Sequence, residues 1–301
     1  MRRNGVVTSA AGLVPFAHLA WGYRDRDEFG ARVGEYFADG LQTNQRMEYV
    51  GDGSREALCA ELADIGLSEG VKSGRIRATP AEDAYEFRPD SDVVDAAATV
   101  VEWVAATEQA IVDGYSGLRT VIDAIAVTRT PEQRNAWASF EFLIDQEMAV
   151  LPSSAMCAYD LASLGDVAAE LMCLHPFVAK NAVGFRLFAE PGIGFALQGE
   201  IDAGNHGIFA TTLERIWQLV EGDPIVIDAR GLDFVTHHQL RMLDEYARAE
   251  QRDVVLRTDQ RIVARLIELL ELTNVRVEAV LPVGRRDTAA VADSRPHPMG
   301  T

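Results

Sequence analysis

Strand-like and helix-like apolar patterns alternate in the last third of the chain. Two short apolar runs at 185–188 and 194–201 are separated by Glu190-Pro191-Gly192, which predicts a hairpin. Apolar residues at helical spacing then predict three helices. Strands are predicted beside them at 224–229, 254–256 and 275–277. This alternation is typical of an α/β layer, and the stretch has about the length of one small domain.

Residues 225–240 are the most informative segment. They predict a buried strand ending at Asp228, a turn around Asp233, and an amphipathic helix that carries Leu240 and Leu243. This layout resembles the switch loop of STAS domains, the module shared by sulfate transporters and anti-sigma-factor antagonists. In that family the strand leads into a Phe-Ile-Asp-Ser-Ser-Gly-Leu-like turn, and a partner kinase phosphorylates the first Ser.

The matching tetrad after Phe234-Val235 reads Thr236, His237, His238 and Gln239. The phosphoacceptor position therefore holds His237, and the glycine position holds Gln239. The resemblance covers roughly 183–280 and implies a small STAS-like α/β domain. It also implies a docking surface, formed by Asp228, Asp233 and the helix start, for an anti-sigma factor of the histidine-kinase-like ATPase type. Phosphate on the usual Ser would break that interface by charge repulsion; here either Thr236 takes the phosphate or control has moved to ligand binding in the N-terminal domain.

Residues 13–181 carry a second ordered set of short motifs. They are His18 and Tyr23 in an early strand, Gly40-Leu41 at a helix end, Gly114-Tyr115-Ser116-Gly117-Leu118-Arg119, Phe140-Glu141, Cys157-Ala158-Tyr159-Asp160 and His175-Pro176. Their order resembles the MEDS domain, a sensory module named from a regulator of methylotrophs and from methanogen sensors. The resemblance implies a RecA-like α/β fold that has lost its nucleotide loop.

A nucleotide site can be sought directly in the sequence. The nearest match to a phosphate-binding loop is residues 66–73, where Val71 occupies the second glycine position and Lys72-Ser73 follow. The residues before it look helical rather than extended, and a β-branched side chain suits the close phosphate approach poorly. A degenerate ATPase-like enzyme therefore stays only as a third alternative.

The charge of the chain limits its partners. It has 301 residues with 28 Lys plus Arg against 46 Asp plus Glu, a net charge of -18. Such a surface repels phosphate backbones and anionic lipid, so we expect neither nucleic acid nor membrane as a partner. Cys59, Cys157 and Cys173 lie in apolar sequence and are expected to be reduced core residues. With no apolar stretch of bilayer length, we expect a cytoplasmic protein.

Aromatic residues of the N-terminal part are numerous enough to line an apolar ligand pocket. The expected ligand-binding residues are His18, Trp21, Tyr23, Tyr115, Arg119, Glu141 and Tyr159, with Trp103 and Trp137 as further aromatic candidates. The alternative is that the aromatic residues are simply core. This pocket rests mostly on analogy with small-molecule-responsive regulators.

Several other residues have both a structural and a functional interpretation. Glu141 and Asp145 are four apart and could form a general acid/base pair, but a solvated helix face is the commoner explanation, with a buried role allowed for Glu141. Arg119 is expected to pair with an acid or to meet an anionic ligand. His237 and His238 could be phosphoacceptors or half of a metal site, although surface residues of a partner-contact loop are favoured.

We therefore predict three parts: a MEDS-like sensory domain at 1–181, a STAS-like domain at 182–281 and a flexible tail at 282–301. The expected function is anti-sigma-factor antagonism by partner switching, without enzymatic activity, cofactor or metal. The alternative is a small-molecule sensor or scaffold subunit that acts without a sigma-factor circuit. The signal, the partner's identity and the oligomeric state, including a homodimer, are left open by the sequence.

Overall fold

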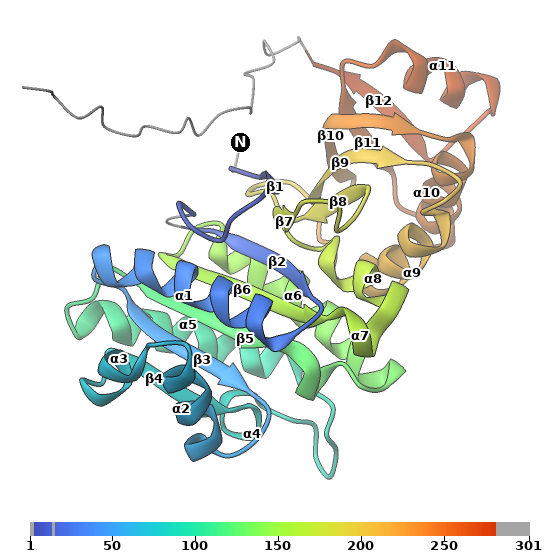
Figure 1. Ribbon diagram of the computed structural model, residues 1–301. Helices are drawn as coiled ribbons and strands as arrows, with labels where there is room; N and C mark the ends of the chain where they lie inside the picture. Colours follow the sequence, from blue (N-terminus) through green and yellow to red (C-terminus); the bar gives the residue numbers. More distant parts are fainter. Residues whose placement is uncertain (1–2, 14–15, 281–301) are drawn as a thin grey trace, which may run out of the picture.

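The computed structural model describes residues 3–13 and 16–280. Two sheets organise the chain, and Figure 1 shows the second one beyond an end of the first. The predicted tail at 282–301 lies outside the described residues. Within the described ranges no helix is both long and apolar enough to cross a bilayer.

The first sheet has seven strands in the order β1-β7-β2-β6-β5-β3-β4, and all its pairings are parallel. Its strands are β1 (Gly5–Val7), β2 (His18–Tyr23), β3 (Arg46–Gly51), β4 (Ile76–Pro80), β5 (Leu118–Asp123), β6 (Ser153–Asp160) and β7 (Phe177–Ala179). The central strands β5 and β6 are buried almost throughout. Continuous burial is typical of parallel strands that are covered on both faces.

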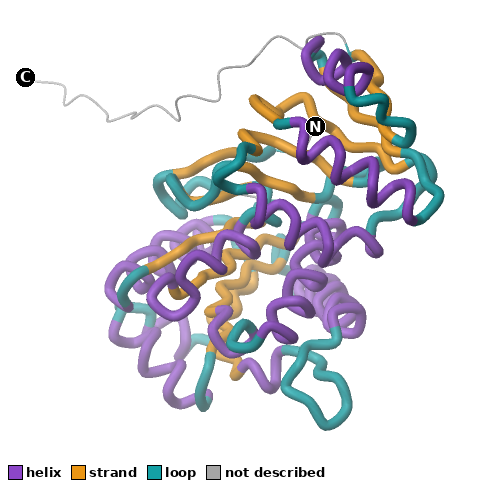
Figure 2. The backbone as a smooth tube through the Cα atoms, turned by 90° about the vertical axis from the view of Figure 1, so that its right-hand side faces the viewer, coloured by secondary structure: helices purple, strands orange, loops and turns teal. Residues whose placement is uncertain are grey.

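Helices cover both faces of this sheet, as Figure 2 shows from the side. They are α1 (Arg26–Gln42), α2 (Arg55–Asp64), α3 (Ser68–Lys72), α4 (Ala81–Ala84), α5 (Ala96–Val112), α6 (Pro131–Met148), α7 (Leu161–Leu164) and α8 (Ala168–Met172), with 3-10 turns η1 (Ala124–Val127) and η2 (Gly165–Val167). Helices α1 and α2 pack on one face and α5 and α6 on the other. Helix α6 starts in a capping box formed by Thr130 and Gln133, with Pro131 in its first turn.

The second sheet has the order β12-β11-β10-β9-β8. Its elements are β8 (Phe185–Phe188), β9 (Phe195–Ile201), α9 (His206–Ile216), η3 (Trp217–Leu219), β10 (Ile225–Val235), α10 (His237–Ala249), β11 (Val254–Thr258), α11 (Arg261–Leu269) and β12 (Val275–Ala279). Strands β8 and β9 form the predicted antiparallel hairpin, and the other pairings are parallel. The predicted α/β class is therefore confirmed for both parts of the chain.

One local prediction was wrong. The strand expected at 224–229 does not end in a turn, because β10 continues to Val235 and α10 begins two residues later. The continuation pairs with β9, with Gly231 opposite Gln198 and Val235 opposite Ile201, and two register shifts absorb the irregular stretch. Such bulges bend a strand without ending it, which is why the local sequence reads as a turn.

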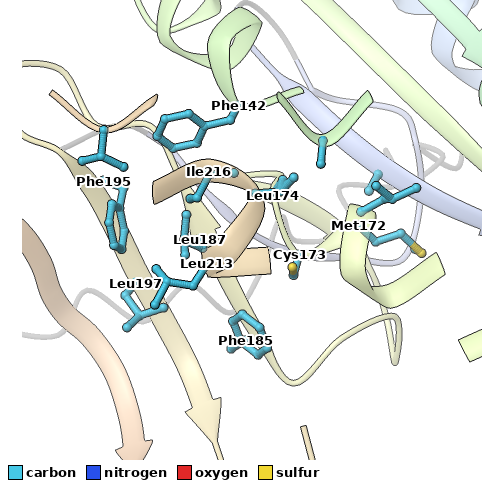
Figure 3. Packing of buried hydrophobic residues seen from close by; sticks show 14 of the residues in the cluster. Phe142, Met172, Cys173, Leu174, Phe185, Leu187, Phe195, Leu197, Leu213 and Ile216 are labelled. Atoms are coloured by element: carbon cyan, nitrogen blue, oxygen red, sulfur yellow. The ribbon is translucent and has the colours of Figure 1, made fainter. Parts of the chain in front are cut away.

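The two sheets share a buried apolar layer. Figure 3 shows Phe142 of α6 and the residues from Met172 to Leu174 facing β8, β9 and α9 of the second part. Polar contacts cross the same boundary: the Leu187 amide donates to the Cys173 carbonyl at 2.7 Å, and Arg215 is 2.8 Å from Glu170. The sheets therefore pack against each other through α6, α8 and α9.

The Gly114–Arg119 motif is explained by backbone geometry. Gly117 has a φ of 153°, and a Cβ there would lie 2.0 Å from the carbonyl oxygen of Pro152. Gly114 also has a positive φ, 89°, but no atom lies within 4 Å of a Cβ built on it. Gly117, the second glycine of the motif, is therefore required both by its backbone conformation and by the close approach of the Pro152 carbonyl.

We predict that Gly117→Ala lowers the free energy of unfolding by about 3 kcal/mol, because strain and overlap add. Gly114→Ala is the matched control, and we expect it to cost about 1 kcal/mol, from strain alone. Urea denaturation followed by circular dichroism measures both. Equal losses in the two variants would show that the contact with Pro152 is relieved at little cost.

Candidate functional site

A buried polar cluster lies between the first sheet and α6. His18 of β2 places its Nδ1 2.9 Å from an Asp145 oxygen and its Nε2 2.9 Å from a Glu141 oxygen. The Sγ of Cys157 is 3.5 Å from both His18 Nε2 and Glu141. His175, between α8 and β7, lies against His18, with the two ring centroids 4.0 Å apart and the rings tilted by 47°. All five side chains are buried.

Two aromatic residues extend this cluster. The hydroxyl of Tyr159 donates to the second oxygen of Glu141 at 2.6 Å, and Nε1 of Trp137 donates to the Tyr159 oxygen at 3.2 Å. Both oxygens of Glu141 therefore accept hydrogen bonds although the side chain has no contact with solvent. A buried carboxylate is tolerated only when it is satisfied in this way.

The electrostatics of the cluster follow from burial and mutual contact. Burial alone would lower the pKa of His18, but its hydrogen bonds to Asp145 and Glu141 raise it to about 9. Burial alone would raise the pKa of Glu141, but the imidazoles of His175 and His18 hold it below its ordinary value. Burial and the neighbouring His18 lower the pKa of His175, and burial beside Glu141 raises the pKa of the Cys157 thiol.

Helix α6 presents its acids to the core. Glu141 and Asp145 lie one turn apart and both are completely buried. The solvated face expected for this pair is therefore wrong, and the buried role allowed for Glu141 is what the structure has. The reason is the aromatic lining of the same helix: Trp137, Phe140 and Phe142 are buried too, so α6 has no wide polar face for these acids.

The predicted ligand-binding residues do not form one pocket. His18, Glu141 and Tyr159 come together, but Trp21 and Tyr23 belong to the core on the opposite face of the sheet. Side chains alternate along a strand, so His18 and Trp21 at odd spacing point to opposite faces. Tyr115 is half-buried and packs at the margin of the core that contains Tyr159. Two open hollows of about 420 and 410 Å³ are lined by none of these residues.

Arg119 is a buried structural residue. Its three guanidinium nitrogens donate to Oε1 of Gln45 at 2.6 Å and to the carbonyls of Tyr36 at 3.1 Å and Leu13 at 2.9 Å. Among its contacts within the described residues there is no carboxylate, so the expected acid pairing is not found there. Gly40 makes room for it, because a Cβ there would lie 2.8 Å from Cδ of Arg119. The Gly40-Leu41 and Gly-Leu-Arg119 motifs therefore meet in space.

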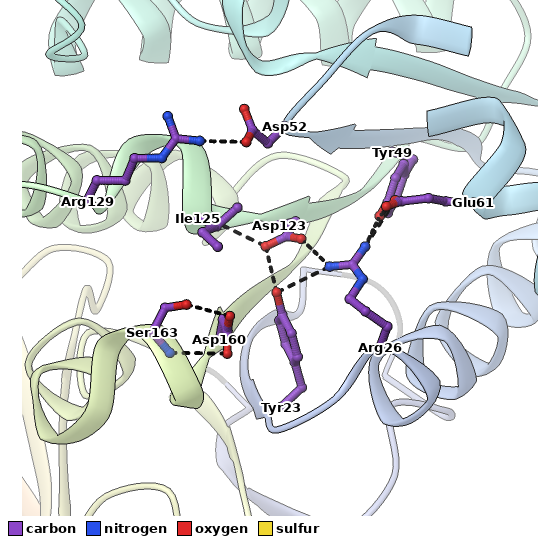
Figure 4. A network of polar contacts seen from close by, with 10 residues as sticks. All are labelled: Tyr23, Arg26, Tyr49, Asp52, Glu61, Asp123, Ile125, Arg129, Asp160 and Ser163. Carbon is purple, nitrogen blue, oxygen red and sulfur yellow. Dashed lines mark hydrogen bonds and ion pairs between the residues drawn. The ribbon is translucent and has the colours of Figure 1, made fainter. Parts of the chain in front are cut away.

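A second polar network lies at the carboxyl ends of the central strands. Figure 4 shows Arg26 reaching from α1 between Asp123, at 2.6 Å, and Glu61, at 3.0 Å. The hydroxyls of Tyr23 and Tyr49 donate to the same two acids. Open α/β sheets bind ligands at this edge. In this protein the charged side chains of Arg26, Asp123 and Glu61 at this edge are paired with one another.

Among the described residues, neither of two candidate segments forms a glycine-rich phosphate loop at that edge. Only Arg24 and Asp25 separate β2 from α1, and the carboxylate of Asp25 caps the helix by accepting from the Glu28 amide at 2.8 Å. The candidate loop at 66–73 follows α2 rather than a strand, and Val71 lies inside α3. The first segment joins a strand to a helix but contains no glycine, and the second does not follow a strand, so neither meets the requirements of a phosphate-binding loop.

The predicted switch residues divide into buried and exposed groups. Asp228 is buried and paired with Arg230, and Gln239 is fully buried, donating to the Asp202 carbonyl at 3.2 Å. Thr236 caps α10 by accepting from the His238 amide at 3.3 Å. Asp233, His237 and His238 are exposed, and the two imidazole rings lie tilted against each other with their centroids 3.9 Å apart. The predicted core position of Cys59 was wrong, since it is half-exposed, whereas Cys157 and Cys173 are buried.

Comparison with known proteins gives one family and a set of distant folds. No curated protein matches the chain. Among solved structures, it is similar to a KaiC-like protein from Pyrococcus horikoshii OT3, at 13% identity and a TM-score of 0.37 over 64% of this chain and 85% of that one. The flagellar accessory protein FlaH from Methanocaldococcus jannaschii is similar at 12% identity and a TM-score of 0.33, over 60% and 74% of the two chains.

The family comparison is more specific. The model of MEDS, the methanogen/methylotroph, DcmR sensory domain, matches residues 17–176. The matched range begins just before β2 and ends just before β7, so it contains every member of the buried cluster. Because the match covers more than half of the 301 residues, the chain belongs to the MEDS family of sensory domains.

Proposed function

We propose that this MEDS protein is a signalling regulator in which the buried cluster of the sensory domain is coupled to the second sheet. The observation that carries the proposal is that one side chain, Asp145, contacts both the cluster and the second part of the chain. Asp145 holds His18 with one carboxylate oxygen and accepts the amide of Ala189, directly after β8, with the other at 2.8 Å. A change in the charge or position of His18 would therefore be transmitted to the second sheet through Asp145.

The output surface is the exposed region at the start of α10. The side chain of Phe234 is 50% exposed, and it lies beside the exposed Asp233, His237 and His238. An exposed large apolar side chain next to titratable groups suits a protein contact better than a solvated surface. We propose that an anti-sigma factor of the histidine-kinase-like ATPase type docks here. The likeness of residues 225–240 to a STAS switch loop supports this choice of partner.

Control of docking is proposed to come from the sensory domain rather than from phosphorylation. His237 stands at the usual acceptor position, and the hydroxyl of Thr236 is engaged as the cap of α10 and donates to Gln239. A ligand or charge change that prefers one arrangement of the two sheets would shift the population of the docking-competent form. The alternative function, a sensor or scaffold without a sigma-factor circuit, predicts other partners for the same surface.

The test is affinity capture from the lysate of the source organism, with mass spectrometric identification, using the full chain. His237→Glu should reduce recovery of a kinase-like anti-sigma factor about tenfold or more, because a carboxylate opposing the partner costs at least about 1.4 kcal/mol. His237→Gln is the matched control, being similar in size and uncharged, and it should retain recovery. Loss in both variants would point to the imidazole itself. Recovery of other proteins only would favour the scaffold alternative.

A further inference from the structure

The buried cluster offers a mixed set of metal-ligand atoms. His18, Glu141, Cys157 and His175 come from β2, α6, β6 and the segment before β7, and each contributes one ligand atom. These four atoms lie within 4.8 Å of one another, and all four side chains are buried. Two imidazoles, a thiol and a carboxylate are the donors that proteins use for zinc and related cations.

We infer that His18, Glu141, Cys157 and His175 form a closed binding site for a first-row transition-metal cation of the zinc class. Tetrahedral zinc with bonds of about 2.0–2.3 Å separates its ligand atoms by roughly 3.3–3.7 Å. The sulfur of Cys157 is 3.5 Å from both His18 Nε2 and Glu141 Oε2, and His175 Nε2 is 3.4 Å from Glu141 Oε2. The 2.9 Å contact between His18 and Glu141 would have to lengthen.

The outer contacts of the cluster are those that orient metal ligands. Nδ1 of His18 bonds to Asp145, which leaves Nε2 directed at the ligand atoms of Glu141 and Cys157. The second oxygen of Glu141 accepts from Tyr159, whose oxygen in turn accepts from Trp137. A carboxylate behind a ligating imidazole fixes its tautomer and orientation and raises its basicity. The cluster therefore has an outer shell as well as four donors.

His175 is the residue that hydrogen bonding alone does not explain. Its side chain is completely buried, yet neither ring nitrogen forms a hydrogen bond with any described residue. Nε2 lies 3.4 Å from Glu141 without hydrogen-bond geometry. Burying an unsatisfied imidazole is unfavourable, and native proteins rarely do so without a partner such as an ion. A cation between the four donors gives His175 that partner.

The site would be structural or regulatory rather than catalytic. Four protein ligands complete a tetrahedral shell and leave no position for a substrate. A cation held there would fix His18, and through His18 the Asp145 side chain that contacts Ala189. The inference goes beyond the proposed docking function and does not depend on which partner binds the second sheet.

The test measures metal in the full-length protein, produced in zinc-supplemented medium without a histidine tag and purified without chelator. We expect about one equivalent of zinc-class metal per chain by plasma mass spectrometry. Production with Co²⁺ should give tetrahedral d–d bands and a thiolate-to-cobalt charge-transfer band. Cys157→Ser should abolish the charge-transfer band. Cys173→Ser, which changes an equally buried cysteine outside the cluster, should retain both metal and band.

A second variant keeps the inference testable if Cys157→Ser does not fold. His175→Leu removes the 3.4 Å contact with Glu141 but no hydrogen bond of good geometry, so we expect it to fold while losing most of the bound metal. Circular dichroism and size-exclusion chromatography check the fold of each variant. Wild type with less than about a tenth of an equivalent of metal from either medium would overturn the inference. So would folded Cys157→Ser and His175→Leu variants that both keep the wild-type metal content.

Discussion

Replacing Asp145 with alanine is expected to destabilise the protein by about 3–5 kcal/mol, the largest effect that we predict for one residue. The Asp145 carboxylate is fully buried and accepts from His18 at 2.9 Å and from the Ala189 amide at 2.8 Å. Alanine leaves both groups without this acceptor, and each unsatisfied buried donor costs about 1–3 kcal/mol. Urea denaturation of the full chain measures the loss.

The loss should also loosen the junction between the two sheets. The chain has two lysines, Lys72 at the end of α3 and Lys180 just after β7, and both are exposed. A lysine-specific protease should therefore cut Asp145→Ala faster at Lys180, beside the junction, while the rate at Lys72 changes less. This ratio of rates separates weakened docking from a general loss of stability, which accelerates both cleavages.

Glu141→Gln is the control for this ratio. Glu141 belongs to the same cluster and is equally buried, but its hydrogen bonds go to His18, Tyr159 and Cys157, all within the sensory domain. We expect it to be destabilising without favouring cleavage at Lys180 over Lys72. If Asp145→Ala gave the same ratio as Glu141→Gln, the contact with Ala189 would not couple the sheets.

The fold was largely predictable because its signals are local. The hairpin of β8 and β9 follows from two apolar runs around Glu190-Pro191-Gly192, and helical spacing located α9, α10 and α11. The end of β10 was missed because its irregular stretch around Gly231 is held by pairing with Gln198 of β9. Pairing with a distant strand leaves no mark on the sequence of the strand itself.

The site was predictable only in part. His18, Glu141 and Tyr159 were three of the seven residues predicted to bind a ligand, and the structure brings these three together, although 123 positions separate His18 from Glu141. Cys157 was assigned to the core as a small apolar residue, although it shares a strand face with Tyr159 two positions later. His175 gave no signal beyond its family motif, because only the strand order, with β7 next to β2, places it beside His18.

Replacing Arg119 with methionine is expected to destabilise the protein by about 3 kcal/mol through a different mechanism. Arg119 is completely buried, and its guanidinium joins Gln45 and the carbonyls of Tyr36 and Leu13 while lying 4.2 Å from the Tyr36 ring centroid. Methionine fills similar space but removes three buried hydrogen bonds at once. Urea denaturation gives the loss, and hydrogen exchange should show reduced protection in the residues up to Leu13.

Two variants separate charge from geometry at this position. Arg119→Lys keeps the charge but replaces a planar fork of five donors by one ammonium, which cannot reach three acceptors in different directions. We therefore expect it to be nearly as destabilising as Arg119→Met. Arg77→Met, at a half-exposed arginine of the edge strand β4, should change stability by less than about 0.5 kcal/mol. A stable Arg119→Lys protein would mean that the buried charge stabilises this junction, whereas the predicted loss would show that β5, α1 and the N-terminal segment are joined by the shape of the guanidinium.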